Sequence, residues 1–229
     1  MPVNRFQLAK MIDYAALQAN TTEKQIRKLC AEAKEFHVAS VCVNPAYVGL
    51  AVNLLKGSDV KVGSVVDFPL GQSTVRVKSF EALDCIGRGA NEIDMVMNVG
   101  ALKSGRLELV KRGIESVVKL ARAKEPQLGQ TITIKVIIEA CYLTDQQKRQ
   151  ASEIVKMSGA DFVKTSTGFG SGGATAKDVK LIREIVGFDV GVKASGGIKT
   201  CDKALELIEA GATRIGTSHA VPILEECAE

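Results

Sequence analysis

Residues 92–98 read Glu-Ile-Asp-Met-Val-Met-Asn, and this short run has the alternating pattern of a β-strand. Successive side chains of a strand point to opposite sides of the sheet, so Ile93, Met95 and Met97 share one side. Similar short runs recur along the chain, and longer amphipathic segments separate them. We therefore predict eight strands, near residues 11–14, 40–43, 60–66, 92–98, 131–139, 161–165, 190–194 and 214–216.

The segments between the predicted strands have the three-to-four spacing of helices with one buried face, clearest in Leu107, Val110, Ile114, Val117 and Ala121. Thr144 and Thr200 are expected to cap the starts of helices, and Gly159 and Gly211 to end them in a left-handed conformation. Eight such units without a linker or a change in composition indicate an α/β fold. We predict a single (β/α)8 TIM barrel, one domain over residues 1–229. A doubly wound open sheet is the structural alternative.

Composition narrows the class of protein. The 229 residues are 46% hydrophobic and 24% charged, which is enough apolar material for a large core. The net charge of +4 is small, and basic residues are interspersed with acidic ones, so we expect no nucleic-acid partner. The start of the chain lacks the apolar run of a signal peptide, and polar residues interrupt the uncharged stretch 36–55. These features predict a cytoplasmic protein without membrane contact.

The cysteines and histidines form no metal-binding pattern. Six cysteines occur without a Cys-x-x-Cys pair, and we expect all six to be reduced thiols. The two histidines, His37 and His219, are too few for a cluster of imidazole ligands. We therefore expect no metal ion.

Four charged residues fall where a barrel would turn them inward. The alternation in successive strands places Asp94, Lys135, Lys164 and Lys193 in one interior. A buried charge is costly unless it is paired, and three lysines with few obvious counter-ions argue against a purely structural ion-pair network. Crowded ammonium groups lower one another's pKa, and a neutral lysine can attack a carbonyl carbon. This pattern does not choose among the three lysines.

Glycine-rich turns follow the last three predicted strands, at residues 165–173, 195–197 and 216–218. Glycines let backbone N–H groups approach a phosphate, and the last two loops of such barrels commonly bind one. Gly168, Gly170 and Gly173 also have the spacing of a dinucleotide fingerprint, but the next strand does not end in the acidic residue that this fingerprint requires. The loops therefore predict a site for a small phosphorylated substrate.

Residues 162–169, Phe-Val-Lys-Thr-Ser-Thr-Gly-Phe, closely resemble the deoxyribose-phosphate aldolases, a class I family that forms a Schiff base on a lysine. The resemblance continues in order along nearly the whole chain, at residues 65–71, 92–98, 136–139, 192–198 and 214–218. It implies the reversible cleavage of 2-deoxy-D-ribose 5-phosphate into D-glyceraldehyde 3-phosphate and acetaldehyde. It also implies no cofactor, small phosphorylated sugar and aldehyde substrates, and a homodimer or a larger homo-oligomer.

The resemblance also implies roles for individual residues. Lys164 would form the Schiff base, Lys193 would lower its pKa, and Asp94 would hold Lys193 and relay protons. The positions that match contacts of the bound sugar phosphate are Asp13, Thr167, Gly168, Gly196, Gly197, Gly216 and Ser218. The chain departs from the usual pattern at Ala15, Asp67 and His219. Another Schiff-base aldolase of this barrel type, or a barrel that binds sugar phosphates without a covalent adduct, are the alternatives.

Overall fold

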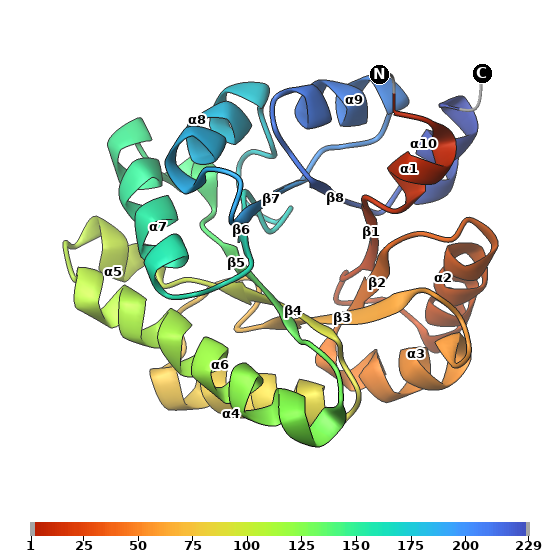
Figure 1. Ribbon diagram of the computed structural model, residues 1–229, viewed down its shortest axis with the longest axis horizontal. Helices are drawn as coiled ribbons and strands as arrows, with labels where there is room; N and C mark the ends of the chain where they lie inside the picture. Colours follow the sequence, from red (N-terminus) through yellow and green to blue (C-terminus); the bar gives the residue numbers. More distant parts are fainter. Residues whose placement is uncertain (1–2, 228–229) are drawn as a thin grey trace.

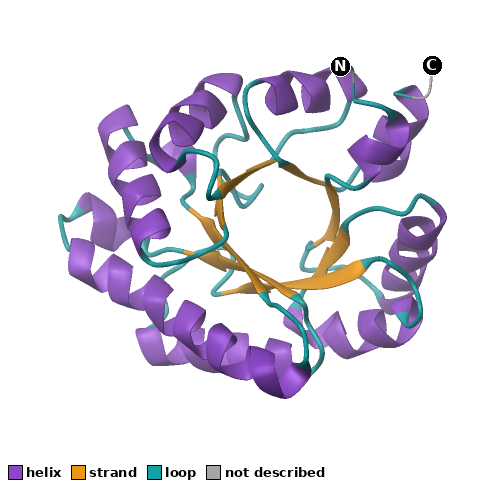
Figure 2. Ribbon diagram, in the orientation of Figure 1, coloured by secondary structure: helices purple, strands orange, loops and turns teal. Residues whose placement is uncertain are grey.

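The computed structural model describes residues 3–227, and its strands form one closed parallel barrel in sequence order (Figure 1). The barrel closes where β1 pairs with β8, with Asp13 opposite Gly216. The helices surround the barrel on the outside (Figure 2). The predicted (β/α)8 architecture is confirmed, and the open sheet is excluded. The strands are β1 (Ile12–Ala16), β2 (Ser40–Val43), β3 (Lys61–Val66), β4 (Glu92–Val96), β5 (Thr133–Ile137), β6 (Phe162–Lys164), β7 (Gly191–Ser195) and β8 (Arg214–Thr217).

The helices begin and end largely where the sequence signals indicate. Thr144 and Thr200 accept hydrogen bonds from the backbone N–H groups of Gln147 and Lys203, which confirms both predicted caps. Gly159 and Gly211 follow their helices with φ of 74° and 113°, as expected. No helix within residues 3–227 is both long and apolar enough to cross a membrane. The α-helices are α1 (Arg5–Ala9), α2 (Glu23–Glu35), α3 (Val48–Leu55), α4 (Val75–Gly87), α5 (Val99–Lys103), α6 (Leu107–Leu128), α7 (Asp145–Met157), α8 (Ala176–Val186), α9 (Cys201–Glu209) and α10 (Ala220–Glu226), and short 3-10 helices lie at Pro45–Tyr47 and Ala140–Tyr142.

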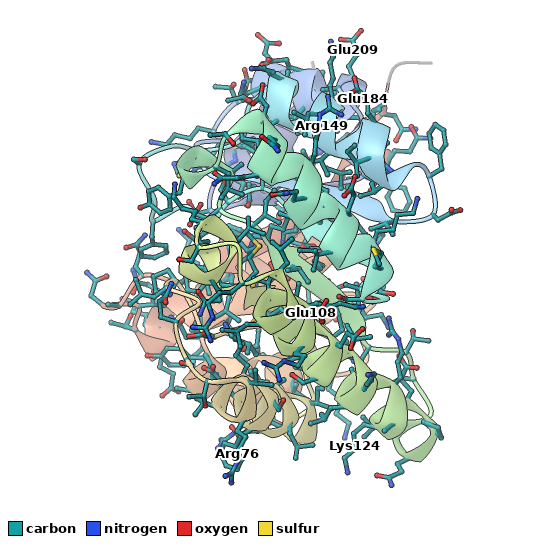
Figure 3. The ribbon with its side chains drawn as sticks, turned by 90° about the vertical axis from the view of Figure 1, so that its left-hand side faces the viewer. Arg76, Glu108, Lys124, Arg149, Glu184 and Glu209 are labelled. Atoms are coloured by element: carbon teal, nitrogen blue, oxygen red, sulfur yellow. A yellow bond between two sulfur atoms is a disulfide. The ribbon has the colours of Figure 1, made fainter. Side chains whose placement is uncertain are left out.

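The hydrophobic core lies between the strands and the helices. Ile93 and Met95 of β4 and Ile134 and Val136 of β5 are fully buried on the side that faces the helices. On the outside of the helical layer, charged side chains such as Glu108 point to solvent (Figure 3). The alternation in the sequence therefore separates an apolar shell from a polar barrel interior.

Two predicted strands extend two residues too far at their carboxyl ends. β4 ends at Val96, and the side chain of Asn98 caps α5 by accepting from the N–H of Ala101 at 2.8 Å. β5 ends at Ile137, and Glu139 has a left-handed backbone conformation with φ of 50°. Asn98 thus bonds to the first turn of α5 and Glu139 to the loop after β6, and the alternating sequence pattern continues beyond the end of each strand.

The prediction that all six cysteines are reduced is wrong for two of them. Cys201 and Cys227 form a disulfide with a Cα–Cα distance of 5.4 Å, which joins the first residue of α9 to the residue after α10. Their separation of 26 residues gives no sign of this pairing, because only the packing of the two helices brings them together. The other four are free, at positions 30, 42, 85 and 141.

We predict a corresponding thiol count. Protein denatured without reductant should present four reactive thiols, and reduced protein should present all six. Titration with a chromogenic disulfide reagent measures both numbers, and Cys201→Ser should release the thiol of Cys227. Six thiols in unreduced, air-exposed protein would contradict the disulfide.

Candidate active site

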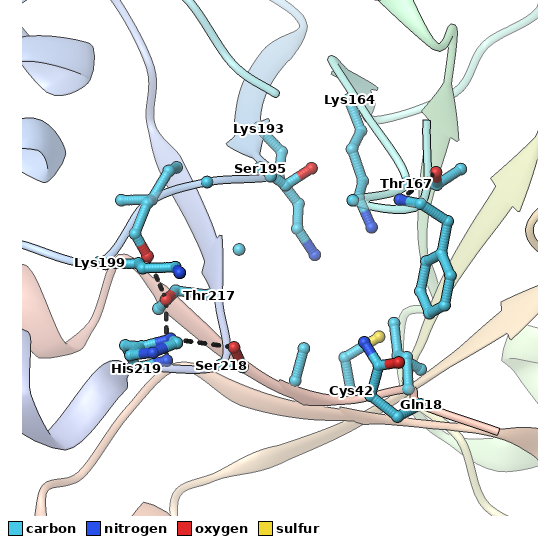
Figure 4. Close-up of a pocket in the computed structure, with 18 residues that line it drawn as sticks. Gln18, Cys42, Lys164, Thr167, Lys193, Ser195, Lys199, Thr217, Ser218 and His219 are labelled. Atoms are coloured by element: carbon cyan, nitrogen blue, oxygen red, sulfur yellow. Dashed lines mark hydrogen bonds between the residues drawn. The ribbon is translucent and has the colours of Figure 1, made fainter. Parts of the chain in front are cut away.

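A cavity of about 400 Å³ opens at the carboxyl ends of β1, β2, β6, β7 and β8 (Figure 4). Barrels of this type carry their active sites at this end. Asp94 and Asp13 do not line the cavity and are fully buried beneath it. The structure thus brings the predicted residues together in two layers, one that lines the cavity and one that is buried below it. The predicted residues in the lining are Lys164, Thr167, Gly168, Lys193, Gly196, Gly197, Gly216 and Ser218.

Asp94 connects the two buried lysines that reach the cavity. Lys164 ends β6 and Lys193 lies beside it in β7, since their Cα atoms are partners in the ladder. The Nζ of Lys164 donates to Oδ2 of Asp94 at 2.6 Å, and the Nζ of Lys193 donates to the same oxygen at 2.7 Å. A single carboxylate oxygen therefore bridges both amines.

A network of ion pairs fills the barrel below them. The Nζ of Lys135 lies 3.1 Å from Oδ1 of Asp94 and 3.0 Å from Oδ2 of Asp13, and it also pairs with Glu92. Arg214 donates to Oδ1 of Asp13 at 2.6 Å and to Oε1 of Glu92 at 2.5 Å. Asp13 thus lies among these cations and pairs with Lys193 as well, away from the cavity surface.

The expectation of too few counter-ions was wrong. Asp13, Glu92 and Asp94 together offset Lys135, Lys193 and Arg214, and Lys164 is the additional base. Arg214 was not among the predicted site residues. It alternates with Gly216 along β8, so the same inward alternation that located the lysines would have found it.

The pKa values of the three lysines move in different directions, and the expected mutual lowering holds only for Lys164. Burial lowers the pKa of Lys164, the charge of Lys193 lowers it further, and Asp94 acts in the opposite direction. Burial also disfavours the charged forms of Lys135 and Lys193, but the nearby carboxylates outweigh it and raise both pKa values. Burial would raise the pKa of Asp94, yet the surrounding lysines hold it well below its usual range. The cavity therefore presents an amine with a lowered pKa beside an ammonium and a carboxylate.

This arrangement suits covalent catalysis on a carbonyl compound. A lysine with a lowered pKa is a nucleophile that forms imines, and a neighbouring ion pair can deliver and accept protons. Cys42 also lines the cavity, but burial raises the pKa of its thiol to about 11. At neutral pH Cys42 is therefore a protonated thiol and a poor nucleophile.

The glycine loops form part of the cavity wall. Gly196 and Gly197 have φ of 88° and 77°, a region that favours glycine. A Cβ at Gly216 would lie 3.0 Å from Cε of Lys193, so a larger residue at position 216 would crowd the Lys193 side chain. Lys199 stands at the exposed rim and adds a positive charge there, a residue that the sequence analysis did not select (Figure 4).

The three departures from the family pattern lie in different places. Ala15 and His219 line the cavity, and the Nδ1 of His219 is 3.0 Å from Oγ of Ser218 (Figure 4). Asp67 lies outside it and forms a buried ion pair with Lys78. Lys78 also donates to the carbonyl oxygen of Val96 at 2.8 Å. Asp67 therefore anchors the loop after β3 and does not contact the cavity.

Opposite pH shifts should follow from substitutions on either side of Lys164. Lys193→Met removes a positive charge and should raise the pKa of Lys164, which moves the acidic limb of its reactivity to higher pH. Asp94→Asn removes the group that raises this pKa and should move the limb to lower pH. The rate of reductive alkylation of Lys164 by a small aldehyde, followed by peptide mass spectrometry across pH, measures both shifts.

Lys61→Met is the matched control, because Lys61 is exposed on β3 and should leave the profile in place. Circular dichroism of each variant reports whether the barrel is intact. Shifts of Lys193→Met and Asp94→Asn in the same direction would contradict the electrostatic account.

Comparison with known proteins agrees with this site. Residues 8–220 match the model of the DeoC/LacD family of aldolases. A protein of Thermoanaerobacter pseudethanolicus, named deoxyribose-phosphate aldolase, is 54% identical over 219 residues, 96% of each chain. The solved deoxyribose phosphate aldolase of Aeropyrum pernix, described as tetrameric, superposes with a TM-score of 0.88 at 35% identity, over 97% of this chain and 91% of that one. A second solved structure, the aldolase QR15, gives a TM-score of 0.89 at 39% identity, over 96% of this chain and 95% of the other. The chain therefore belongs to the DeoC/LacD family of aldolases.

Proposed function

We propose that this aldolase reversibly cleaves 2-deoxy-D-ribose 5-phosphate into D-glyceraldehyde 3-phosphate and acetaldehyde. The observation that carries the proposal is the amine of Lys164, which reaches the cavity with a lowered pKa and shares one oxygen of Asp94 with Lys193. The name of the relative that is 54% identical over almost its whole length supports the substrate.

In the proposed reaction, Nζ of Lys164 attacks C1 of the open-chain sugar, and loss of water gives an iminium ion. The electrons of the C2–C3 bond flow into this iminium as the bond breaks, while the C3 hydroxyl loses its proton and becomes the carbonyl of glyceraldehyde 3-phosphate. The remaining enamine takes a proton at C2, and hydrolysis releases acetaldehyde and the free lysine.

Asp94 and Lys193 would manage the protons of this cycle. The bridging oxygen of Asp94 lies between the two amines, so a proton that arrives there can pass to either side. Lys193 keeps its positive charge because Asp13 and Asp94 raise its pKa. That charge favours the neutral form of Lys164 at the start of the cycle.

The glycine loops and Lys199 would hold the phosphate. Gly196, Gly197 and Ser218 lie on the same cavity as Lys164, so one substrate can span both ends. Glycine lets the backbone approach a phosphate group closely, and the lysine at the rim adds a favourable charge. Binding of this remote group positions C1 at the amine.

Assembly and location extend this proposal. The relative from Aeropyrum pernix is described as tetrameric, and we propose that this chain also forms a homodimer or a larger homo-oligomer. We propose a cytoplasmic location, where sugar phosphates are metabolised.

Borohydride trapping with acetaldehyde tests the nucleophile. We expect an ethyl group on Lys164, found by peptide mass spectrometry, because reduction of the acetaldehyde imine leaves a stable secondary amine. An adduct on Lys193 would move the nucleophile to that residue. Active, folded protein without any adduct would favour a barrel that binds sugar phosphates non-covalently.

Lys164→Leu should lower cleavage of deoxyribose 5-phosphate to about 1% of the wild-type rate or less, because the variant lacks the proposed nucleophile and nearby carboxylates keep the adjacent Lys193 protonated. A coupled assay for glyceraldehyde 3-phosphate measures the rate. Product analysis in the same assay separates this activity from that of an aldolase with a keto donor. Cleavage at a tenth of the wild-type rate would be incompatible with the assigned role.

A further inference from the structure

Glu139 lies outside the machinery described so far and has an unusual environment. It follows β5 and is 3% exposed, with φ of 50° and ψ of 64°. A left-handed backbone is unfavourable for a side chain of this size, and such conformations gather at functional sites. Within residues 3–227, no lysine, arginine or histidine forms an ion pair with Glu139. This buried carboxylate therefore needs other partners.

Its main partner is Thr167, three residues after Lys164 on the wall of the cavity, and the thiol of Cys141 lies 4.0 Å from Oε1. The backbone N–H of Thr167 donates to Oε1 and Oε2 of Glu139 at 3.1 and 3.3 Å. The hydroxyl of Thr167 donates to Oε2 as well. The backbone N–H and the side-chain hydroxyl of Thr167 therefore both donate to the same carboxylate.

These bonds fix what the Thr167 hydroxyl can offer a substrate. A hydroxyl has one proton and two lone pairs, and a carboxylate only accepts, so the proton points to Glu139. The N–H of Phe169 donates to Oγ1 of Thr167 at 3.0 Å and occupies one lone pair. The lone pair that remains can accept a hydrogen bond, and Thr167 has no proton left to donate.

The surrounding loop is shaped around Glu139. The N–H groups of Ile138 and Ala140 donate to the carbonyl oxygens of Lys164 and Thr165 at 3.0 and 2.8 Å, so the turn at Glu139 is fastened to the segment that carries the nucleophile. A Cβ at Gly170 would lie 3.2 Å from Cδ of Glu139, which shows how closely the loop wraps the carboxyl group. This part of the cavity wall therefore packs directly against Glu139.

We infer that Glu139 is a positioning residue that makes Thr167 a dedicated acceptor for a substrate hydroxyl. This inference rests on the proposed function. The C3 oxygen of the sugar becomes a carbonyl on cleavage and then cannot donate. The hydroxyl on C4, next to the aldehyde carbon of glyceraldehyde 3-phosphate, is a donor on both sides of the reaction. Thr167 therefore selects acceptor aldehydes that carry a hydroxyl beside the carbonyl.

The test runs the reaction in the direction of synthesis, with acetaldehyde as donor and two acceptors. D-Glyceraldehyde 3-phosphate carries the hydroxyl, and 3-oxopropyl phosphate lacks it but keeps the phosphate. In Glu139→Gln the amide can donate to Thr167, whose hydroxyl is then free to turn. We expect the kcat/KM preference for the hydroxylated acceptor to fall about fivefold to tenfold. Borohydride trapping with acetaldehyde checks that the variant still folds and forms its adduct.

Thr167→Val and Thr167→Ser test the same contact if Glu139→Gln fails to fold. The valine variant should lose the preference to a similar extent, the serine variant should keep it, and Glu139→Gln with Thr167→Val should lose no more than either alone. Glu108→Gln, on the exposed face of α6, is the matched control and should keep the wild-type preference.

Two outcomes would overturn the inference. Equal losses for both acceptors would reduce Glu139 to a structural role, and an unchanged preference in both Glu139→Gln and Thr167→Val would remove Thr167 as the selecting group. If the wild type forms no acetaldehyde adduct, the proposed function itself fails and this inference falls with it.

Discussion

The buried carboxylate of Asp94 is the constraint on which the rest of the site depends. Its oxygens contact Lys164 at 2.6 Å, Lys193 at 2.7 Å and Lys135 at 3.1 Å, and each lysine comes from a different strand. A charge at this depth requires such partners. A slip of one residue in any of these strands would turn its lysine toward the helices. The ion pairs of Asp94 therefore fix the register of β4, β5, β6 and β7, and the same ion pairs set the chemistry of the cavity.

The same network explains why the pKa of Lys164 is lowered while the pKa values of Lys135 and Lys193 are raised. Lys135 pairs with Asp13, Glu92 and Asp94, and Lys193 pairs with Asp13 and Asp94. Lys164 is nearly as deeply buried but pairs only with Asp94 among the described residues. All three lose hydration, and the number of carboxylates in contact decides whether that loss is compensated. The least compensated amine is also the one that ends its strand at the cavity.

Sequence reasoning reached the fold and most of this site because both rest on local alternation. Position along the strand alone predicts that Ile93 and Val136 face the helices and that Asp94 and Lys135 face the barrel interior. Two features depend on contacts between distant segments and were out of reach, whereas the inward alternation of β8 could have indicated Arg214. Cys201 meets Cys227 only after two helices pack, and Glu139 leaves its strand to bond Thr167. The alternation before Glu139 gives no sign of its left-handed turn.

The pairing of β1 with β8 has a consequence for the order of synthesis. Asp13 and Arg214 are 201 residues apart, yet they share a hydrogen bond at the base of the site. Chains are made from the N-terminus, so β1 must wait for almost the entire polypeptide before its buried carboxylate finds this partner. Burial is the largest cause of the lowered pKa of Lys164, and this burial requires the closed barrel. The amine therefore gains its reactivity only with the last strand, so the completed fold and the activated nucleophile arise together.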